Sequence, residues 1–100
     1  MTLYIDINCD LGEDSSDQGV ARDLALMAQI SSCSIACGGH AGSDTSMRHM
    51  VENAIALGLR IGAHPSYPDK ENFGRKSVTL SSSDLMASLN DQISSLKDIV

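Results

Sequence analysis

Two histidines of this 100-residue chain stand where an imidazole can face a ligand. His40 lies in the run Gly-Gly-His-Ala-Gly, where the backbone can approach a ligand closely, and His64 lies between a short apolar run and Pro65. With the carboxylate of Asp10, these side chains would suit zinc or a similar divalent ion that activates water. The spacing of 10, 40 and 64 is no compact metal motif. Neutral rings held by hydrogen bonds explain the same histidines equally well.

Acidic and amide side chains alternate with apolar ones near the amino terminus. Asp6, Asn8 and Asp10 share one face of an alternating segment, and Glu13 follows in the next turn. Buried carboxylates are costly unless they are paired or bind a ligand, so we expect these residues to have partners. An antiparallel edge with its polar side in water is the alternative. Glu13 is either a third catalytic acid or a solvated loop residue.

A long loop from His64 to about residue 80 carries further polar groups. Arg75 can hold a carboxylate or phosphate with its planar guanidinium, or can instead pair with Asp69 and pin the loop. Ser66, Asn72 and the backbone of Gly39 complete the expected substrate-binding set, together with Asp6 and Asn8. Cys37 is assigned to packing, since nothing near it in the sequence would lower its pKa. His49 is expected on the surface.

Hydrophobic periodicity predicts the elements that must position these residues. We expect strands at 3–9, 33–37 and 59–63, and helices across about 20–30, from Ser43 or Asp44 to Gly58, and from the serines at 81–83 onward. In the first strand the apolar set Leu3, Ile5 and Ile7 should face the helices. The inward stripes expected on the helices are Val20, Leu24, Met27 and Ala28; Met47, Val51, Ala54 and Ile55; and Met86, Leu89, Ile93, Leu96 and Val100.

This β-α-β-α-β-α order predicts a parallel sheet with right-handed crossovers. The expected polar clusters follow all three strands, at the edge where parallel α/β proteins bind ligands. Asp10, His40 and His64 should therefore lie close together. The chain stops in mid-helix, so we expect residues 1–100 to be the amino-terminal part of one larger domain, with Ile93, Leu96, Ile99 and Val100 exposed and the chain self-associating or inactive alone.

Composition narrows the class of partner. The chain has 7 Lys and Arg against 13 Asp and Glu, which argues against a nucleic-acid partner. No apolar run is long enough to cross a bilayer and no signal peptide is recognisable, so a cytoplasmic location is expected and no membrane partner. Three cysteines cannot all pair, which argues against a disulfide framework.

Three segments together resemble the LamB/YcsF family. They are Asp6-Ile-Asn-Cys-Asp-Leu-Gly-Glu13, Ile35-Ala-Cys-Gly-Gly-His-Ala-Gly42 and Gly62-Ala-His-Pro-Ser-Tyr-Pro-Asp-Lys-Glu-Asn-Phe-Gly-Arg75, and the likeness covers essentially the whole chain. Two positions depart, since the family usually has Asn where Ser34 stands and Asp where Ser43 stands. Family members are roughly two and a half times as long, the size of a complete barrel.

The resemblance implies a (β/α) barrel of the glycosidase/deacetylase type. It also implies the A subunit of a 5-oxoprolinase, which opens the lactam of 5-oxoproline to L-glutamate with ATP and works with the B and C subunits. The chain has no Walker-type phosphate loop, so ATP would be contacted by this rim, by further residues or by partner subunits. Two alternatives stay open: a metal-dependent, deacetylase-like hydrolase using Asp10, His40 and His64, and a module that serves only in assembly. The sequence leaves the general base unassigned.

Overall fold

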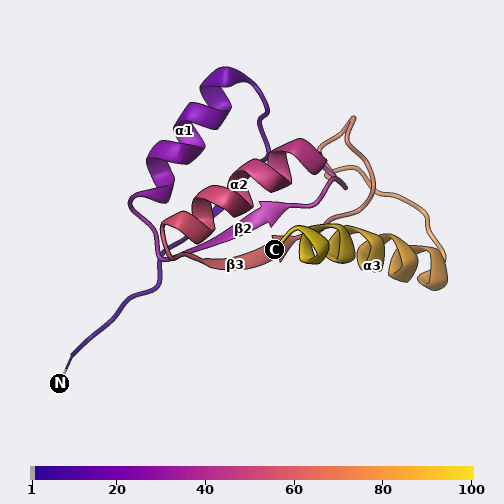
Figure 1. Cartoon of the computed structure of the whole chain (residues 1–100). Coiled ribbons are helices and arrows are strands. Elements are labelled where there is room, and N and C mark those ends of the chain that lie inside the picture. Colours follow the sequence, from indigo (N-terminus) through magenta and orange to yellow (C-terminus); the bar gives the residue numbers. More distant parts are fainter. Residues whose placement is uncertain (1) are drawn as a thin grey trace.

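Three short parallel strands form the sheet, in the order β1-β2-β3. The computed structural model describes residues 2–100. Along the chain these contain β1 (Asn8–Leu11), α1 (Asp17–Met27), β2 (Ser32–Ala36), α2 (Asp44–Ala56), β3 (Arg60–His64) and α3 (Ser82–Ile99) (Figure 1). The expected α/β class, element order and parallel pairing are confirmed. The three strands end at the same edge of the sheet, so the loops that follow them meet there.

The two faces of the sheet differ sharply in character. Cys33 and Ile35 of β2 and Leu11 of β1 are fully buried beneath the helices. The opposite face carries the polar positions of each strand, and the register aligns them in rows: Asn8 with Ser32 and Arg60, and Asp10 with Ser34 and Gly62. Since side chains alternate along a strand, the row after these holds Ala36 and His64. Polar groups of different strands are thereby brought side by side on one face.

A serine caps the start of each helix. The hydroxyls of Ser16, Ser43 and Ser81 accept hydrogen bonds from backbone N–H groups in the first turns of α1, α2 and α3. At α2 the cap is reciprocal, because the Ser46 hydroxyl accepts from the backbone N–H of Ser43 at 2.8 Å. Ser43, one of the two departures from the family pattern, thus still starts its helix. None of the helices described within residues 2–100 is long and apolar enough to cross a membrane.

The face that α3 turns inward differs from the expected one. Leu89 is partly buried and Leu96 is buried, as predicted, but Met86, Ile93 and Val100 are exposed. Gln92 occupies the inward position between Leu89 and Leu96, and Ile99 occupies the inward position after Leu96. Gln92 takes its place there because its amide group hydrogen-bonds the backbone of Ser66, which no apolar side chain can do. Of the four residues expected to stay exposed because the chain stops in mid-helix, Ile93 and Val100 are exposed, but the expectation was wrong for Leu96 and Ile99.

The inward stripes of α1 and α2 need smaller corrections. Met27 is buried, while Val20 and Leu24 pack partly against the core. Asp23, which the apolar pattern does not include, is buried beside them. In α2, Ile55 is 60% exposed and Met50 is buried in its place. The inward arc of this helix is therefore Met47, Met50, Val51 and Ala54.

The first strand is shorter than predicted and starts at Asn8 instead of Leu3. Its partner β2 begins at Ser32, directly after the turn that ends α1, so residues before Asn8 have no strand beside them. Leu3 and Ile5 are consequently 84% and 80% exposed, and Ile7 is half exposed. The prediction that these three residues face the helices was wrong. In Figure 1 this segment runs away from the body of the molecule as the indigo tail.

Two glycines at helix boundaries adopt positive φ for different reasons. Gly42 (φ +92°) follows the His40 turn, and a Cβ there would lie 2.9 Å from the carbonyl oxygen of Ala36. Gly58 (φ +70°) follows α2, and a Cβ there would meet nothing within 4 Å. Both positions favour glycine for backbone conformation, but only Gly42 is also confined by its neighbours.

We therefore predict that Gly42→Ala destabilises the chain more than Gly58→Ala. Gly58→Ala should cost only the strained backbone, about 1 kcal/mol. Gly42→Ala should cost at least about 1 kcal/mol more, because the β2 backbone must also move. The free energy of unfolding, measured by urea titration of both variants, checks this. Equal losses would contradict the contact with Ala36.

Candidate active site

One open cavity of about 270 Å³ lies at the carboxyl ends of the strands. It is lined by Asp10, Glu13, His40, His64, Ser66, Phe73, Gly74 and Arg75. All four residues expected to be catalytic are among them, as are two of the six expected to bind substrate. The three loops that follow β1, β2 and β3 all contribute, as their parallel arrangement requires.

Glu13 reaches the cavity from the turn after β1. Gly12 adopts φ +76° in this turn, and its N–H donates a 3.0 Å hydrogen bond to a carboxylate oxygen of Asp23 in α1. Asp23 is only 3% exposed, so this hydrogen bond is made away from water. A buried residue of the first helix thus fixes the turn that presents Glu13.

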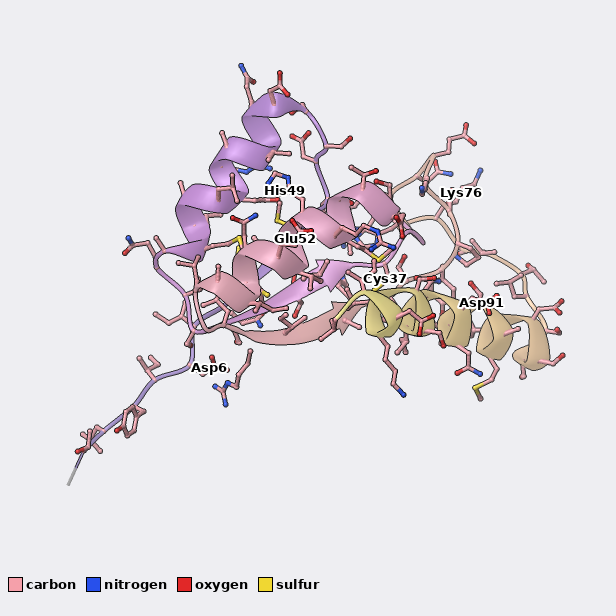
Figure 2. All side chains as sticks on the ribbon, in the orientation of Figure 1. Asp6, Cys37, His49, Glu52, Lys76 and Asp91 are labelled. Atoms are coloured by element: carbon pink, nitrogen blue, oxygen red, sulfur yellow. The ribbon has the colours of Figure 1, made fainter. Side chains whose placement is uncertain are left out.

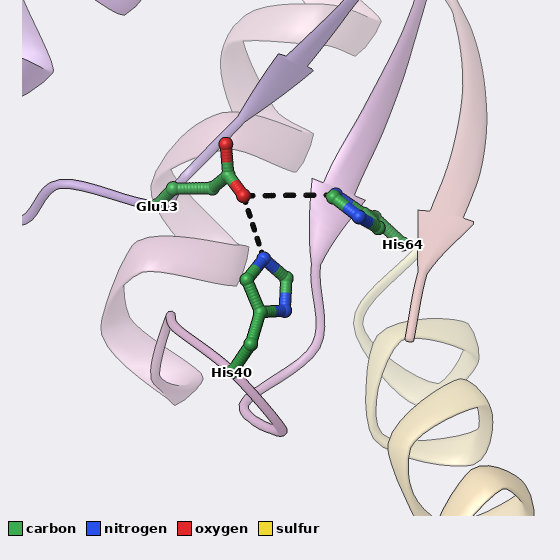
Figure 3. Close-up of side chains that lie close together, drawn as sticks. All are labelled: Glu13, His40 and His64. Carbon is green, nitrogen blue, oxygen red and sulfur yellow. Dashed lines mark hydrogen bonds and ion pairs between the residues drawn. The ribbon is translucent and has the colours of Figure 1, made fainter. Parts of the chain in front are cut away.

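His40 is the most enclosed group of the site, with a side chain 3% exposed. Its Nε2 lies 2.6 Å from a carboxylate oxygen of Glu13 (Figure 3). Its Nδ1 lies 3.0 Å from the Ser66 hydroxyl oxygen. The ring of Phe73 meets the imidazole edge-on, with centroids 4.8 Å apart. His40 is therefore held on three sides by groups from two loops, Glu13 after β1 and Ser66 and Phe73 after β3.

The protons of this network can be counted. The Ser66 hydroxyl has one proton, and it is placed to donate it to the carbonyl oxygen of Tyr67 at 3.0 Å. With its own proton directed to Tyr67, the hydroxyl oxygen accepts from Nδ1 of the His40 ring, and this arrangement places a proton on that nitrogen. Nε2 is left facing Glu13, and those two atoms share one further proton at 2.6 Å. A proton held between a carboxylate and an imidazole is the arrangement that general acid–base chemistry uses.

His64 stands beside this pair with an unused nitrogen. Its Nδ1 is buried and has no hydrogen-bond partner in the described part of the chain. The nearest carboxylate oxygens are those of Asp10 at 3.8 Å and Glu13 at 3.9 Å, and the two imidazole rings lie 4.5 Å apart. Glu13, His40 and His64 each offer one ligand atom, and these atoms lie within 4.8 Å of one another (Figure 3).

The structure changes one residue in the expected set of metal ligands. Sequence spacing grouped Asp10 with the two histidines, but Glu13 is the carboxylate that reaches both rings. Asp10 contacts only His64 and is half exposed. An oxygen and two nitrogen donors, one of them buried without a partner, fit a divalent ion such as zinc. Asp10, His40 and His64 were expected to lie close together. This expectation is met for two pairs, His64 with Asp10 and His64 with His40.

The loop from residue 69 to residue 75 covers one side of the cavity. The backbone N–H of Asp69 donates to the carbonyl of Gly39, which ties the loop to the His40 turn. Asp69 also accepts hydrogen bonds from Asn72, and this leaves Arg75 free of it. Phe73 adopts φ +55°, and the guanidinium of Arg75 lies 5.9 Å from the centre of its ring. The alternative of an Arg75–Asp69 pair is therefore not realised, because Asp69 pairs with Asn72, and Arg75 lines the cavity.

The remaining expected substrate-binding residues lie elsewhere. Asp6 lies at the opposite end of the sheet, where its carboxylate accepts from Ser31 and Ser32; these hydrogen bonds hold its pKa below the usual range (Figure 2). Asn8 bonds the hydroxyls of Ser32 and Ser34 on the polar sheet face. Neither residue lines the cavity. Gly39 and Asn72 instead form hydrogen bonds with Asp69, in the loop that covers the cavity.

Gln92 is a site residue that sequence reasoning missed. Its side chain accepts from the N–H of Ser66 at 3.0 Å and donates to the carbonyl of the same residue at 2.8 Å. The available signal was a polar residue in an apolar face, since Leu89, Gln92, Leu96 and Ile99 recur at helical spacing. Cys37 and His49 were expected to have no role in the site. Cys37 is buried, as expected of a packing residue, and burial raises the pKa of its thiol. His49 is exposed on α2, also as expected (Figure 2).

Comparison with known proteins agrees with this architecture. The A subunit of a 5-oxoprolinase from Chloroflexus aggregans is 43% identical over 97 residues, which are 97% of this chain and 38% of that protein. The crystal structure of the lactam utilization protein from Thermus thermophilus superposes with a TM-score of 0.87 at 34% identity, covering 97% of this chain and 39% of that one. The chain thus spans under two fifths of the length of these relatives. The model of the LamB/YcsF family matches residues 5–100, and the chain belongs to that family.

Proposed function

We propose that this chain is the amino-terminal part of a hydrolase that opens the lactam of 5-oxo-L-proline to L-glutamate with hydrolysis of ATP. In this proposal it belongs to the A subunit of a cytoplasmic 5-oxoprolinase and works with the B and C subunits. The names of the two relatives support the substrate class. The observation that carries the proposal is the meeting of Glu13, His40 and His64 in one cavity with Arg75.

The cavity suits a small amide that bears a carboxylate. Arg75 supplies a cationic planar fork for the carboxylate at one side. At the other side the Glu13–His40 pair holds a proton at Nε2, within reach of a bound amide group or a water molecule. The site thus has separate groups for recognising the substrate and for moving a proton, and 5-oxoproline has a matching carboxylate and lactam.

ATP requires more than the described residues supply. Of the seven Lys and Arg residues, Arg75 is the one that lines this cavity. One cation and 270 Å³ do not accommodate a nucleoside triphosphate together with a substrate. We therefore place nucleotide contacts on the rest of a longer barrel or on the partner subunits, and assign no step of ATP chemistry to these residues.

A metal-dependent, deacetylase-like hydrolase is the second candidate, favoured by the partnerless Nδ1 of His64. Glu13, His40 and His64 would hold the ion, which would supply an activated water for attack on an amide carbonyl. The two candidates share the cavity and differ in what makes the amide reactive. Metal binding and carboxylate recognition therefore test them separately.

Glu13→Gln should weaken binding of Zn²⁺ at least about tenfold, because a neutral amide replaces the one carboxylate that reaches both histidines. Isothermal titration calorimetry of the chain with Zn²⁺ measures this. The matched control is Glu52→Gln, the same change at an exposed position of α2. If the parent chain binds no Zn²⁺, or if both variants bind it like the parent, the metal candidate fails.

Arg75→Ala should weaken binding of 5-oxo-L-proline about tenfold or more, because a charged hydrogen bond is lost. Binding is followed by NMR shifts of cavity residues on titration with this ligand. Lys76→Ala removes an equal charge from the next, exposed residue and should leave binding unchanged. Pyrrolidin-2-one has the lactam without the carboxylate, and it should bind the parent and Arg75→Ala alike. An equal loss for both ligands would remove Arg75 from substrate recognition.

We further propose that the 100-residue chain self-associates. Within residues 2–100, β1 and β3 are outer strands with one unpaired edge each, and such edges pair readily with other chains. Met86, Ile93 and Val100 of α3 add exposed apolar surface. Sedimentation should therefore show concentration-dependent dimers or larger species, reduced by Ile93→Lys. A monomer at every concentration would contradict this proposal.

A further inference from the structure

Gln92 reaches the active site through the backbone of one residue, Ser66. It is 7% exposed and comes from α3, the helix farthest along the chain from β1. Its amide oxygen accepts from the Ser66 N–H, and its amide nitrogen donates to the Ser66 carbonyl. The nitrogen has a second acceptor in the hydroxyl of Ser88, one helical turn earlier, at 3.1 Å. The side chain is thereby fixed from its own helix as well as from the loop.

This clamp fixes the backbone that carries the Ser66 hydroxyl. Ser66 is two residues beyond His64, and its hydroxyl lies 3.0 Å from Nδ1 of His40. Gly39 leaves room for the arrangement, since a Cβ at that position would collide with the Gln92 amide oxygen and the Ser66 hydroxyl. The backbone of Gly39 beside His40, the Ser66 hydroxyl and the Gln92 amide are thus packed too closely to admit a side chain at residue 39.

We propose that Gln92 is a positioning residue that acts on His40 through Ser66. By holding the Ser66 hydroxyl beside Nδ1, it keeps a proton on that nitrogen and turns Nε2 toward Glu13 and the cavity. A histidine that binds a metal or moves a proton needs its other nitrogen fixed in this way. The inference rests on the proposed function, in which His40 works through Nε2.

The test compares three substitutions by two measurements. Gln92→Leu removes both hydrogen bonds to Ser66 and keeps a side chain of similar size. Gln92→Glu keeps the acceptor and loses the donor, and Ser66→Ala removes the hydroxyl but leaves the clamp. Gln18→Leu, the same change at an exposed position of α1, is the matched control and should leave both measurements unchanged. The first measurement is Co²⁺ affinity by visible absorption, where the absence of a thiolate band separates this site from cysteine binding. The second is the ¹⁵N shifts of the His40 ring without metal, which report whether Nδ1 carries a proton.

Gln92→Leu and Ser66→Ala should bind Co²⁺ about 10- to 100-fold more weakly than the parent, with Gln92→Glu between them and the parent. In both, the ¹⁵N shift of Nδ1 should move toward that of an unprotonated ring nitrogen, because the acceptor of its proton is lost or displaced. A merely structural role for Gln92 would lower the melting temperature and leave the ring shifts of the folded protein unchanged.

Parent-like affinity and ring shifts in Ser66→Ala would overturn the proposal, even if Gln92→Leu does not fold. Parent-like values in a folded Gln92→Leu would overturn it as well. If the parent itself binds no Co²⁺, the metal candidate fails instead, and the ring shifts of the same variants still decide the role of Gln92.

Discussion

Parallel pairing of three short strands is the constraint on which the site depends. Because β1, β2 and β3 run in the same direction, their carboxyl ends meet at one edge. Residues 13, 40 and 64 are far apart in sequence, yet each follows or ends one of these strands. An antiparallel strand in the middle would send His40 to the other end of the sheet. Strand direction, more than any local motif, thus brings two imidazoles and a carboxylate close together.

The backbone arrangement could be predicted because it follows local rules. Alternation of apolar residues, serines at helix starts and Gly58 after α2 each indicate one element, and their order implies parallel pairing. The start of β1 could not be predicted this way. Residues 3–7 alternate like a strand, but a strand also needs a partner, and the turn before Ser32 leaves none beside them. Pairing is a property of two segments, so one segment's pattern cannot reveal its limits.

The site was predictable to the level of which loops meet, and less so for individual atoms. The carboxylate that reaches both rings is Glu13 instead of Asp10, because the Gly12 turn, held by Asp23, carries the chain over the cavity. The inward face of α3 differs from the predicted one for a related reason. An apolar stripe assumes that only hydrophobic burial orients a helix, whereas Gln92 is drawn inward by a peptide group. Ser34, the other departure from the family pattern, donates to Asn8 and so remains part of the polar sheet face.

The position of Gln92 has a thermodynamic consequence for α3. This helix lies beside α2 and holds the Ser66 loop, so opening α3 would release the hydroxyl that His40 needs (Figure 1). Occupation of the cavity and docking of the helix are therefore linked equilibria, and linkage is reciprocal. Any molecule held at His40 would slow hydrogen exchange at the backbone amides of α3, a helix with which it makes no contact.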